Sequence, residues 1–199
     1  MSGEHREGQG QRATGIPGTL PRAAGSPVGF DIETTGITDT DIVTVACAWT
    51  PTHQAHCFYG EDPSPVVAML DEAKYIYTFN GMEFDLPRFA RHCGRSMGPW
   101  ARKTVDPLFA MKCSMGYGAC AKLNDVLNEN GYEPKSGSGL QAIQFWNDGN
   151  RDALLSYCMD DARLTHAVCD QKEVRWARKW VVKLYDPAAM LGLQEEMAR

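Results

Sequence analysis

The sequence VGFDIETTG, residues 28–36, decides how the rest of the chain is interpreted. Its short apolar run, bounded by glycine, predicts a central β-strand over residues 28–32. Asp31 and Glu33 stand two positions apart, so their side chains project to the same side of a strand. Acids in an apolar strand cost free energy unless they are paired or bind a cation. Carboxylate oxygens are the ligands that Mg²⁺ and Mn²⁺ prefer, but an isolated Asp-x-Glu pair is equally compatible with a structural role.

The segments downstream predict an α/β protein, in which a mixed sheet of about five strands carries helices on its faces. Short spacings between the first strands indicate an antiparallel meander, and the aromatic run YIYTF suits a buried parallel strand. Further strands are expected over 41–49, 55–59 and 75–79, and a fifth ends near 105–106. Helices are expected over 65–73, 84–93, 108–115, 122–130, 140–146, 151–169 and about 171–185.

Two further segments carry acidic residues. TFNGMEFD, residues 78–85, follows a strand, so a strand-end loop places Asp85 where it can join Asp31 and Glu33, or where it caps the next helix. In YCMDD, residues 157–161, Tyr157 and Asp161 are four positions apart and share one face of a helix. Asp160 points about 100° away and is expected to be solvated or a secondary contact.

Taken together and in this order, the three segments resemble the motifs of the DnaQ-like (DEDD) exonuclease superfamily, which has a ribonuclease H-like fold. The resemblance covers about residues 28–169: FDIETTG matches the first motif, TFNGMEFDLPRF looks like the second, and YCMDDARLT matches the third. Tyr157 stands where the DEDDy branch has tyrosine. The sister branch places histidine five residues before the last Asp, and here that position is Ser156.

The resemblance implies a 3′→5′ exonuclease that holds two Mg²⁺ or Mn²⁺ ions. Asp31 would bridge both ions, Glu33 and Asp161 would complete the first, and Asp85 would hold the second. Tyr157 would hydrogen-bond the attacking water and aim it, because a phenol with a pKa near 10 is a poor base. The nucleotides released would be nucleoside monophosphates.

Three more residues are candidate substrate contacts. Asn80 either contacts the terminal nucleotide or braces its loop, and Thr34 either bonds the terminal sugar or is structural. Phe84, and less so Phe89, offers a stacking surface or packs its helix. Asp106 lies at a strand end, and the sequence leaves undecided whether its side chain supports the residues of the site.

Composition limits the partners and the compartment. The net charge of −5 argues against broad electrostatic binding of duplex DNA. The resemblance implies the 3′ end of a single strand as the partner, and a polymerase or another replication or repair protein as a candidate partner in trans. No apolar run is long enough to span a membrane. Seven dispersed cysteines without a Cys-x-x-Cys pair indicate reduced thiols in the cytoplasm or nucleus, although arginines in the leader leave organelle targeting open.

We therefore expect a flexible leader over 1–27, an exonuclease domain over 28–170, and a C-terminal helix and tail over 171–199. DNA is the favoured substrate. The alternatives are an enzyme that trims RNA 3′ ends, a catalytically silent exonuclease-like module that binds a partner, and an endonuclease or resolvase of the wider ribonuclease H-like group.

Overall fold

The computed structural model describes residues 25–115, 120–135, 137–171, 173–177 and 180–183. The expected leader, except for its last residues 25–27, and the tail from 184 onward lie outside the described residues. The domain boundaries expected from the sequence therefore stay predictions.

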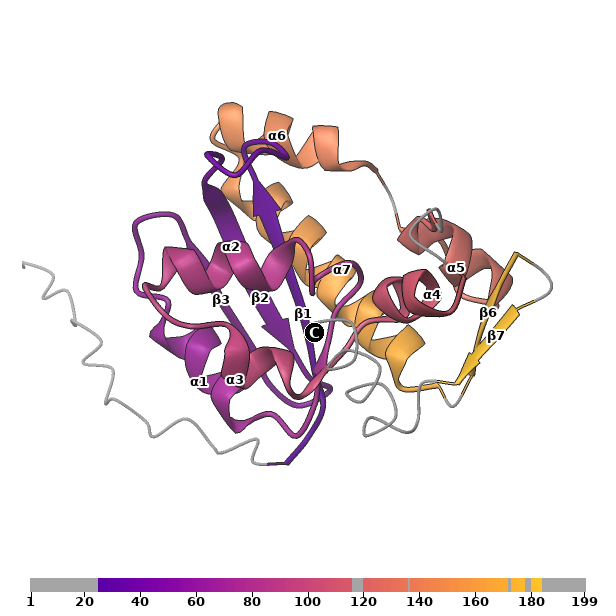
Figure 1. Cartoon of the computed structure of the whole chain (residues 1–199). Coiled ribbons are helices and arrows are strands. Elements are labelled where there is room, and N and C mark those ends of the chain that lie inside the picture. Colours follow the sequence, from indigo (N-terminus) through magenta and orange to yellow (C-terminus); the bar gives the residue numbers. More distant parts are fainter. Residues whose placement is uncertain (1–24, 116–119, 136, 172, 178–179, 184–199) are drawn as a thin grey trace, which may run out of the picture.

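A mixed five-stranded sheet forms the centre of the molecule, with strand order β3-β2-β1-β4-β5 (Figure 1). The strands are β1 (Val28–Thr34), β2 (Val43–Trp49), β3 (Gln54–Phe58), β4 (Ile76–Tyr77) and β5 (Thr104–Val105). The first three form an antiparallel meander, and β4 and β5 run parallel to β1. The predicted mixed ribonuclease H-like sheet is confirmed, although β4 is shorter than the strand expected over 75–79.

Helices cover both faces of this sheet (Figure 1). On one face lie α1 (Ser64–Glu72), α2 (Asp85–His92) and the short α3 (Gly98–Ala101), which the sequence analysis did not predict. The other face carries α6 (Gly139–Asn147) and α7 (Arg151–Cys169), while α4 (Pro107–Met115) and α5 (Leu123–Glu129) lie beyond the β4–β5 side. None of the described helices combines the length and the apolar character needed to cross a lipid bilayer.

The alternation of β1 separates the core from the acids. Phe30 and Ile32 are almost fully buried in the cluster under α1, α2 and α3. Because successive strand residues point to opposite faces, Gly29, Asp31 and Glu33 face the other way, toward α7. The apolar half of the strand therefore anchors β1, and the acidic half is presented to the long helix.

Gly29 allows α7 to lie close against β1. A Cβ atom at this position would come within 2.1 Å of the Ala162 carbonyl oxygen and 2.8 Å of the His166 Cβ. Real side chains do not tolerate such distances, so any larger residue would push the helix away. The close approach brings the segment that contains Asp161 next to the segment that contains Asp31.

The helix expected over about 171–185 is wrong within the described residues. These residues form a separate hairpin of β6 (Glu173–Trp176) and β7 (Trp180–Lys183), in which Trp176 is opposite Trp180. Ala177 has a φ of 53°, a turn conformation that ends any helical repeat. Valine and tryptophan favour strands, and this preference decides against the helical spacing of the apolar residues.

Candidate metal centre

Three of the expected carboxylates converge on one point. Asp31 and Glu33 come from β1, and Asp161 comes from α7. One carboxylate oxygen from each lies within 4.8 Å of the other two. Asp161 is only 3% exposed, and its Oδ1 atom is buried without a hydrogen-bond partner in the described structure. A buried carboxylate oxygen without a partner is costly in free energy, and a bound cation would supply the missing partner.

The electrostatics of the cluster point the same way. Burial, followed by repulsion from Asp161 and Asp85, raises the pKa of Asp31 well above its usual range. Burial and Asp161 raise the pKa of Glu33 to about 8. Such shifts mean that the protein lacks enough positive charge here to keep all the acids ionised near neutral pH. A divalent cation supplies that charge.

Asp85, the fourth expected acid, lies beside this group but is not part of it. It is the first residue of α2 and is buried. One of its oxygens accepts a 3.1 Å hydrogen bond from the backbone N–H of Ile32, the residue between Asp31 and Glu33. Burial raises the pKa of Asp85 to about 7, and its charge in turn raises the pKa of Asp31. The structure thus brings three acids together directly and a fourth next to them.

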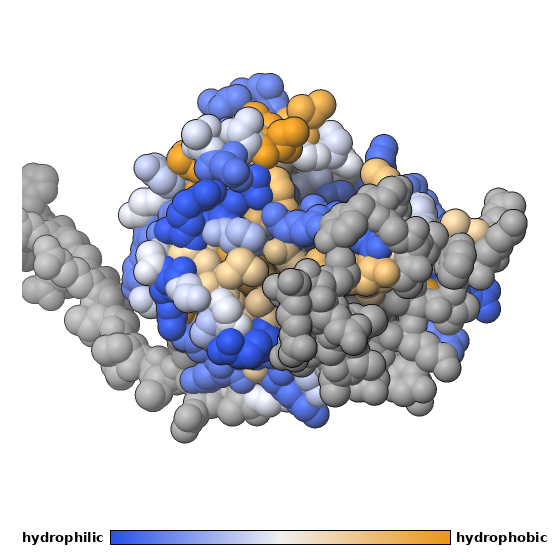
Figure 2. Space-filling view, viewed as in Figure 1, coloured by the Kyte–Doolittle hydropathy of each residue, from blue (hydrophilic) through white to orange (hydrophobic). Residues whose placement is uncertain are grey.

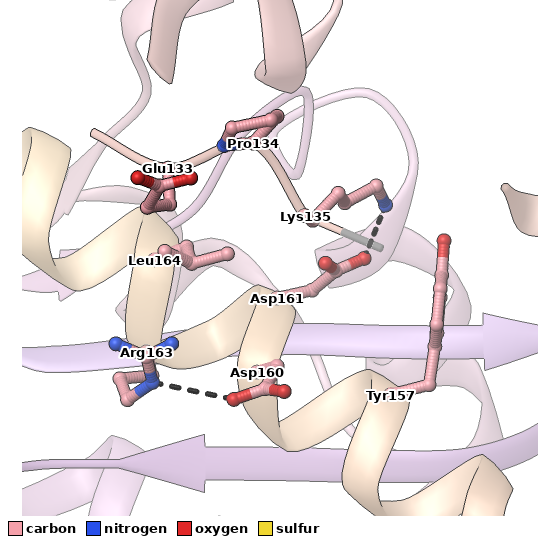
Figure 3. Close-up of a pocket in the computed structure, with 8 residues that line it drawn as sticks. All are labelled: Glu133, Pro134, Lys135, Tyr157, Asp160, Asp161, Arg163 and Leu164. Atoms are coloured by element: carbon pink, nitrogen blue, oxygen red, sulfur yellow. Dashed lines mark hydrogen bonds and ion pairs between the residues drawn. The ribbon is translucent and has the colours of Figure 1, made fainter. Parts of the chain in front are cut away.

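Tyr157 lies one helical turn before Asp161 on α7, and both side chains point to the same side (Figure 3). The Tyr157 hydroxyl is buried and makes no hydrogen bond of good geometry to the described residues, but the nearby Lys135 ammonium interacts with it and opposes the rise of its pKa. Burial raises the pKa of Tyr157 to about 12, so the group stays a phenol that can donate a hydrogen bond. Asp160 is exposed, points away and pairs with Arg163 at 3.3 Å, as predicted.

Lys135 is a site residue that the sequence analysis missed. Its ammonium group forms an ion pair with Asp161 Oδ2 and lies 4.8 Å from the centre of the Tyr157 ring (Figure 3). Burial alone would lower the pKa of Lys135, but the charge and hydrogen bond of Asp161, together with Tyr157 and Asp31, raise it. The residue comes from the segment between α5 and α6, which carries no periodic pattern. Its only sequence signal was a basic residue beside a glycine- and serine-rich run.

Asp106, for which a supporting role was left open, braces the loop that delivers Asp85. Its fully buried carboxylate accepts 3.0 Å hydrogen bonds from the backbone N–H groups of Asn80 and Met82, and a 3.1 Å bond from Phe109. Asn80 has a φ of 68°, a conformation rare outside glycine, so the loop depends on these bonds. The contacts of Asn80 itself brace the loop, since its side-chain oxygen accepts a 3.2 Å hydrogen bond from Lys112.

A mostly apolar hollow of about 390 Å³ adjoins the acids, and Glu33 is part of its lining. Two expected substrate contacts, Thr34 and Phe84, also line it, as do the strongly exposed Ile37 and Leu140. Hydrophobic surface is visible near α6 at the top of the molecule (Figure 2). The Thr34 hydroxyl donates a hydrogen bond to the Gly36 carbonyl, which is the structural role.

Of the two phenylalanines considered for stacking, only Phe84 borders the hollow. Phe89 is fully buried, with its ring 5.2 Å from Phe30 and 5.8 Å from Trp100 between centroids. It therefore packs the core. The ring of Phe84 is backed by the Arg88 guanidinium, whose central carbon lies 3.8 Å from the ring centroid.

A comparison with protein families gives a match over most of the described chain. A model of the RNase H superfamily matches residues 28–172, which include all the expected site residues. The chain belongs to the RNase H superfamily. A search of curated proteins found no significant match. Membership of the RNase H superfamily indicates a nuclease, and therefore a hydrolase that binds nucleic acid.

Nucleases of the RNase H superfamily usually use divalent metal ions, and the residues present here fit such ions. The donor set of Asp31, Glu33 and Asp161 consists of hard carboxylate oxygens, gathered within 4.8 Å of one another. No cysteine or histidine belongs to this group, which argues against a zinc-type set. Mg²⁺ and Mn²⁺ are the ions that this chemistry favours.

Proposed function

We propose that the protein is a 3′→5′ exonuclease that hydrolyses single-stranded nucleic acid, with DNA favoured, and releases nucleoside monophosphates. The observation that carries the proposal is the convergence of Asp31, Glu33 and Asp161, with Tyr157 one turn from Asp161 and Asp85 alongside. A cluster with this make-up, in a chain of the RNase H superfamily, supports the three-motif resemblance to DEDDy exonucleases.

In this proposal Asp31, Glu33 and Asp161 would hold one ion, and Asp31 with Asp85 would hold the second. Bound ions would polarise the phosphodiester and lower the pKa of the attacking water, which eases the build-up of negative charge at phosphorus. Tyr157 donates a hydrogen bond that orients this water, since its phenol stays protonated and the Lys135 ammonium that interacts with its hydroxyl is a donor, which leaves the hydroxyl proton available. Asp106 and Asn80 keep the loop in place, so Asp85 reaches the site in a fixed position.

The hollow beside Glu33 is an argument that the substrate is the end of a nucleic-acid strand. Phe84, Ile37 and Leu140 offer apolar surface on which a base can lie once its neighbouring phosphate is at the acids. Stacking of this kind does not depend on base identity, as expected for an enzyme that removes successive nucleotides. The net charge of −5 favours a short contact at a strand end over a grip along a duplex.

The test is a side-by-side digest of DNA and RNA oligonucleotides, labelled at either the 5′ or the 3′ end, with Mg²⁺ or Mn²⁺. A 3′→5′ exonuclease releases the 3′ label at once as a mononucleotide and shortens the 5′-labelled strand stepwise. The variant Asp31→Ala, checked for an unchanged fold by circular dichroism, is the control for a contaminating nuclease and should be inactive.

The other outcomes separate the alternatives. Faster digestion of the RNA strand would identify an RNA-trimming enzyme. Internal cuts in both labelled strands would indicate an endonuclease and contradict the proposed direction. A complete lack of product, with metal bound, would leave a catalytically silent module that acts through a protein partner.

A further inference from the structure

Lys135 is held at the acids from both ends. Its backbone N–H donates a 2.9 Å hydrogen bond to the Asn124 side-chain oxygen, and its carbonyl accepts a 3.3 Å bond from the Asn124 amide nitrogen. At the other end its ammonium pairs with Asp161, whose side chain is only 5% exposed. Asn124 lies in the first turn of α5, a rigid element. The lysine is therefore delivered to the cluster by a fixed anchor.

The charge of Lys135 acts on the whole cluster. It lowers the pKa of Asp31, of Glu33 and of Asp161, and so opposes the upward shifts that burial and mutual repulsion cause. Other cations near the site are engaged elsewhere in the described structure. Arg163 pairs with Asp160, and Lys112 pairs with Glu83. Lys135 thus serves as the counter-ion of the three converging acids.

A divalent ion and this ammonium would both bind the carboxylate of Asp161. Lys135 bonds Asp161 Oδ2, and Asp161 is one of the three residues whose oxygens converge. A lysine ammonium and a divalent cation on one carboxylate would stand a few ångströms apart and repel each other. Binding of the divalent ion and the ion pair of Lys135 with Asp161 therefore oppose each other.

The structure also offers the lysine a place to move to. A hollow of about 190 Å³ lies next to Asp161 and is lined by Lys135, Glu133, Asp160 and Arg163, among others (Figure 3). The side chain has four rotatable carbon bonds, so its ammonium can turn into this hollow while Asn124 keeps the backbone in place. The carboxylate of Glu133 borders the same space.

We propose that Lys135 is a tethered counter-ion, which neutralises the acid cluster in the metal-free protein and leaves Asp161 when a divalent ion binds. Metal affinity is then set by the exchange of one cation for another. The inference rests on the metal site of the proposed function, but not on the direction of hydrolysis or the sugar of the substrate.

The experiment is a calorimetric titration of Mn²⁺ into the metal-stripped full chain without nucleic acid. Lys135→Met keeps the length and removes the charge, so its Kd should fall by about tenfold or more, given the size of charge interactions at this range. Lys135→Arg keeps the charge and should stay near wild type. Lys122→Met removes an equal charge from an exposed position just before α5 and should leave the Kd unchanged.

A thermal melt gives a second readout. The metal-free Lys135→Met protein should melt below wild type, because the acids have lost their counter-ion, and Mn²⁺ should raise its Tm by more than it raises that of wild type. If that variant does not fold without metal, Asn124→Ala is titrated instead. It releases the anchor, leaves every acid in place, and should bind Mn²⁺ more tightly than wild type.

The counter-ion role is overturned if Lys135→Met binds Mn²⁺ no more tightly than wild type, or if Asn124→Ala does so where it replaces that variant. This result leaves the proposed nuclease intact. A different failure is the absence of Mn²⁺ binding in both wild type and Lys135→Met. That result overturns the metal site itself, and the proposed function with it. Asp31→Ala should bind no Mn²⁺, whether it is made in wild type or in Lys135→Met. This control shows that the heat signal comes from this site.

Discussion

The backbone N–H of Ile32 donates a 3.1 Å hydrogen bond to the carboxylate of Asp85. The parallel pairing of β1 with β4 ends at Gly29 opposite Tyr77, so β1 runs on past the end of its neighbour. Beyond the end of β4, the Asp85 carboxylate accepts the hydrogen bond that a longer neighbouring strand would otherwise accept. It therefore joins α2 to β1 at the residue between the two strand acids, and it has a structural role beside its proposed metal role.

Two substitutions of Asp85 separate these roles. Asp85→Asn keeps an oxygen for the Ile32 N–H but loses the charge, whereas Asp85→Ala loses both. We expect both variants to lose about a hundredfold or more of kcat, or ~2.7 kcal/mol of the barrier. Only Asp85→Ala should also be destabilised, by about 1–3 kcal/mol, because it leaves a buried donor unsatisfied. Urea unfolding and exonuclease rates measure the two effects, and full activity in Asp85→Asn would remove Asp85 from the metal site.

Adjacent aspartates on α7 provide a matched pair. Asp161 is buried in the cluster, while Asp160 is exposed and paired with Arg163. Asp161→Asn should lose Mn²⁺ binding and at least about a hundredfold of activity. Asp160→Asn removes the same charge one residue away and should change activity by less than about twofold, since exposed ion pairs contribute little. Equal losses in the two variants would mean that net charge, not a ligand position, is responsible.

The acids could be picked out from sequence because three segments together resemble one family's motifs, and within each segment their spacing reflects regular geometry. A two-residue period put Asp31 and Glu33 on one side of β1, and a four-residue step put Tyr157 and Asp161 on one face of α7. The five-stranded mixed sheet followed from strand spacing and turn residues. These patterns depend on local structure alone, which is why they survive without knowledge of the packing.

Lys135 and the bracing role of Asp106 depend on tertiary contacts that no local pattern encodes. Lys135 reaches Asp161 only because Asn124 fixes an irregular segment, and Asp106 binds N–H groups that lie 24 and 26 positions away. The prediction of a C-terminal helix over about 171–185 failed for a different reason. The apolar residues of this segment fit a helical period as well as a strand period, and pairing between Glu173–Trp176 and Trp180–Lys183 decides the outcome.

Removing the carboxylate of Asp106 should loosen the loop before it affects any ligand directly. Asp106→Ala leaves three backbone N–H groups without their acceptor, and we expect a loss of stability of about 2–3 kcal/mol or more. Activity should fall as well, because Asp85 is no longer held in position. Lys112→Met leaves the acceptor of the three N–H groups in place and removes only the contacts of the Lys112 ammonium with Asn80 and Glu83, so it is the milder control. Unchanged activity in a destabilised Asp106→Ala protein would show that the loop does not position Asp85.

The stability of the metal-free protein should fall as pH rises from about 5 to 8. The pKa of Glu33 is raised to about 8 and that of Asp85 to about 7, so the folded state holds protons that the unfolded state has released. The unfolding free energy decreases with pH wherever the folded state binds more protons. This contribution is present below the ordinary carboxyl pKa and is lost as pH passes about 8.

Melting curves in a chelator across this pH range measure the slope. Saturating Mg²⁺ should flatten it, since a bound cation favours the ionised acids, and metal binding should release protons. Glu33→Gln should reduce the slope in the metal-free protein, while Glu72→Gln, at an exposed position on α1, should not. A Tm that rises steadily with pH in the chelator would contradict the raised pKa values.

Tyr157→Phe should slow the reaction without affecting metal binding. The hydroxyl orients the attacking water but is no ligand in the proposal, so kcat should fall by about ten- to a hundredfold, as for other groups that position a metal site's partners. Asp31→Ala should lose far more. Stability should change by less than about 1 kcal/mol, because the buried hydroxyl makes no well-formed hydrogen bond to the described residues and loses only its interaction with the Lys135 ammonium. Tyr77→Phe, an equally buried tyrosine at 7% exposure on β4, is the control for removing a phenolic oxygen. Wild-type kcat in Tyr157→Phe, with unchanged Kd for Mn²⁺, would show that the water is oriented by the ions alone.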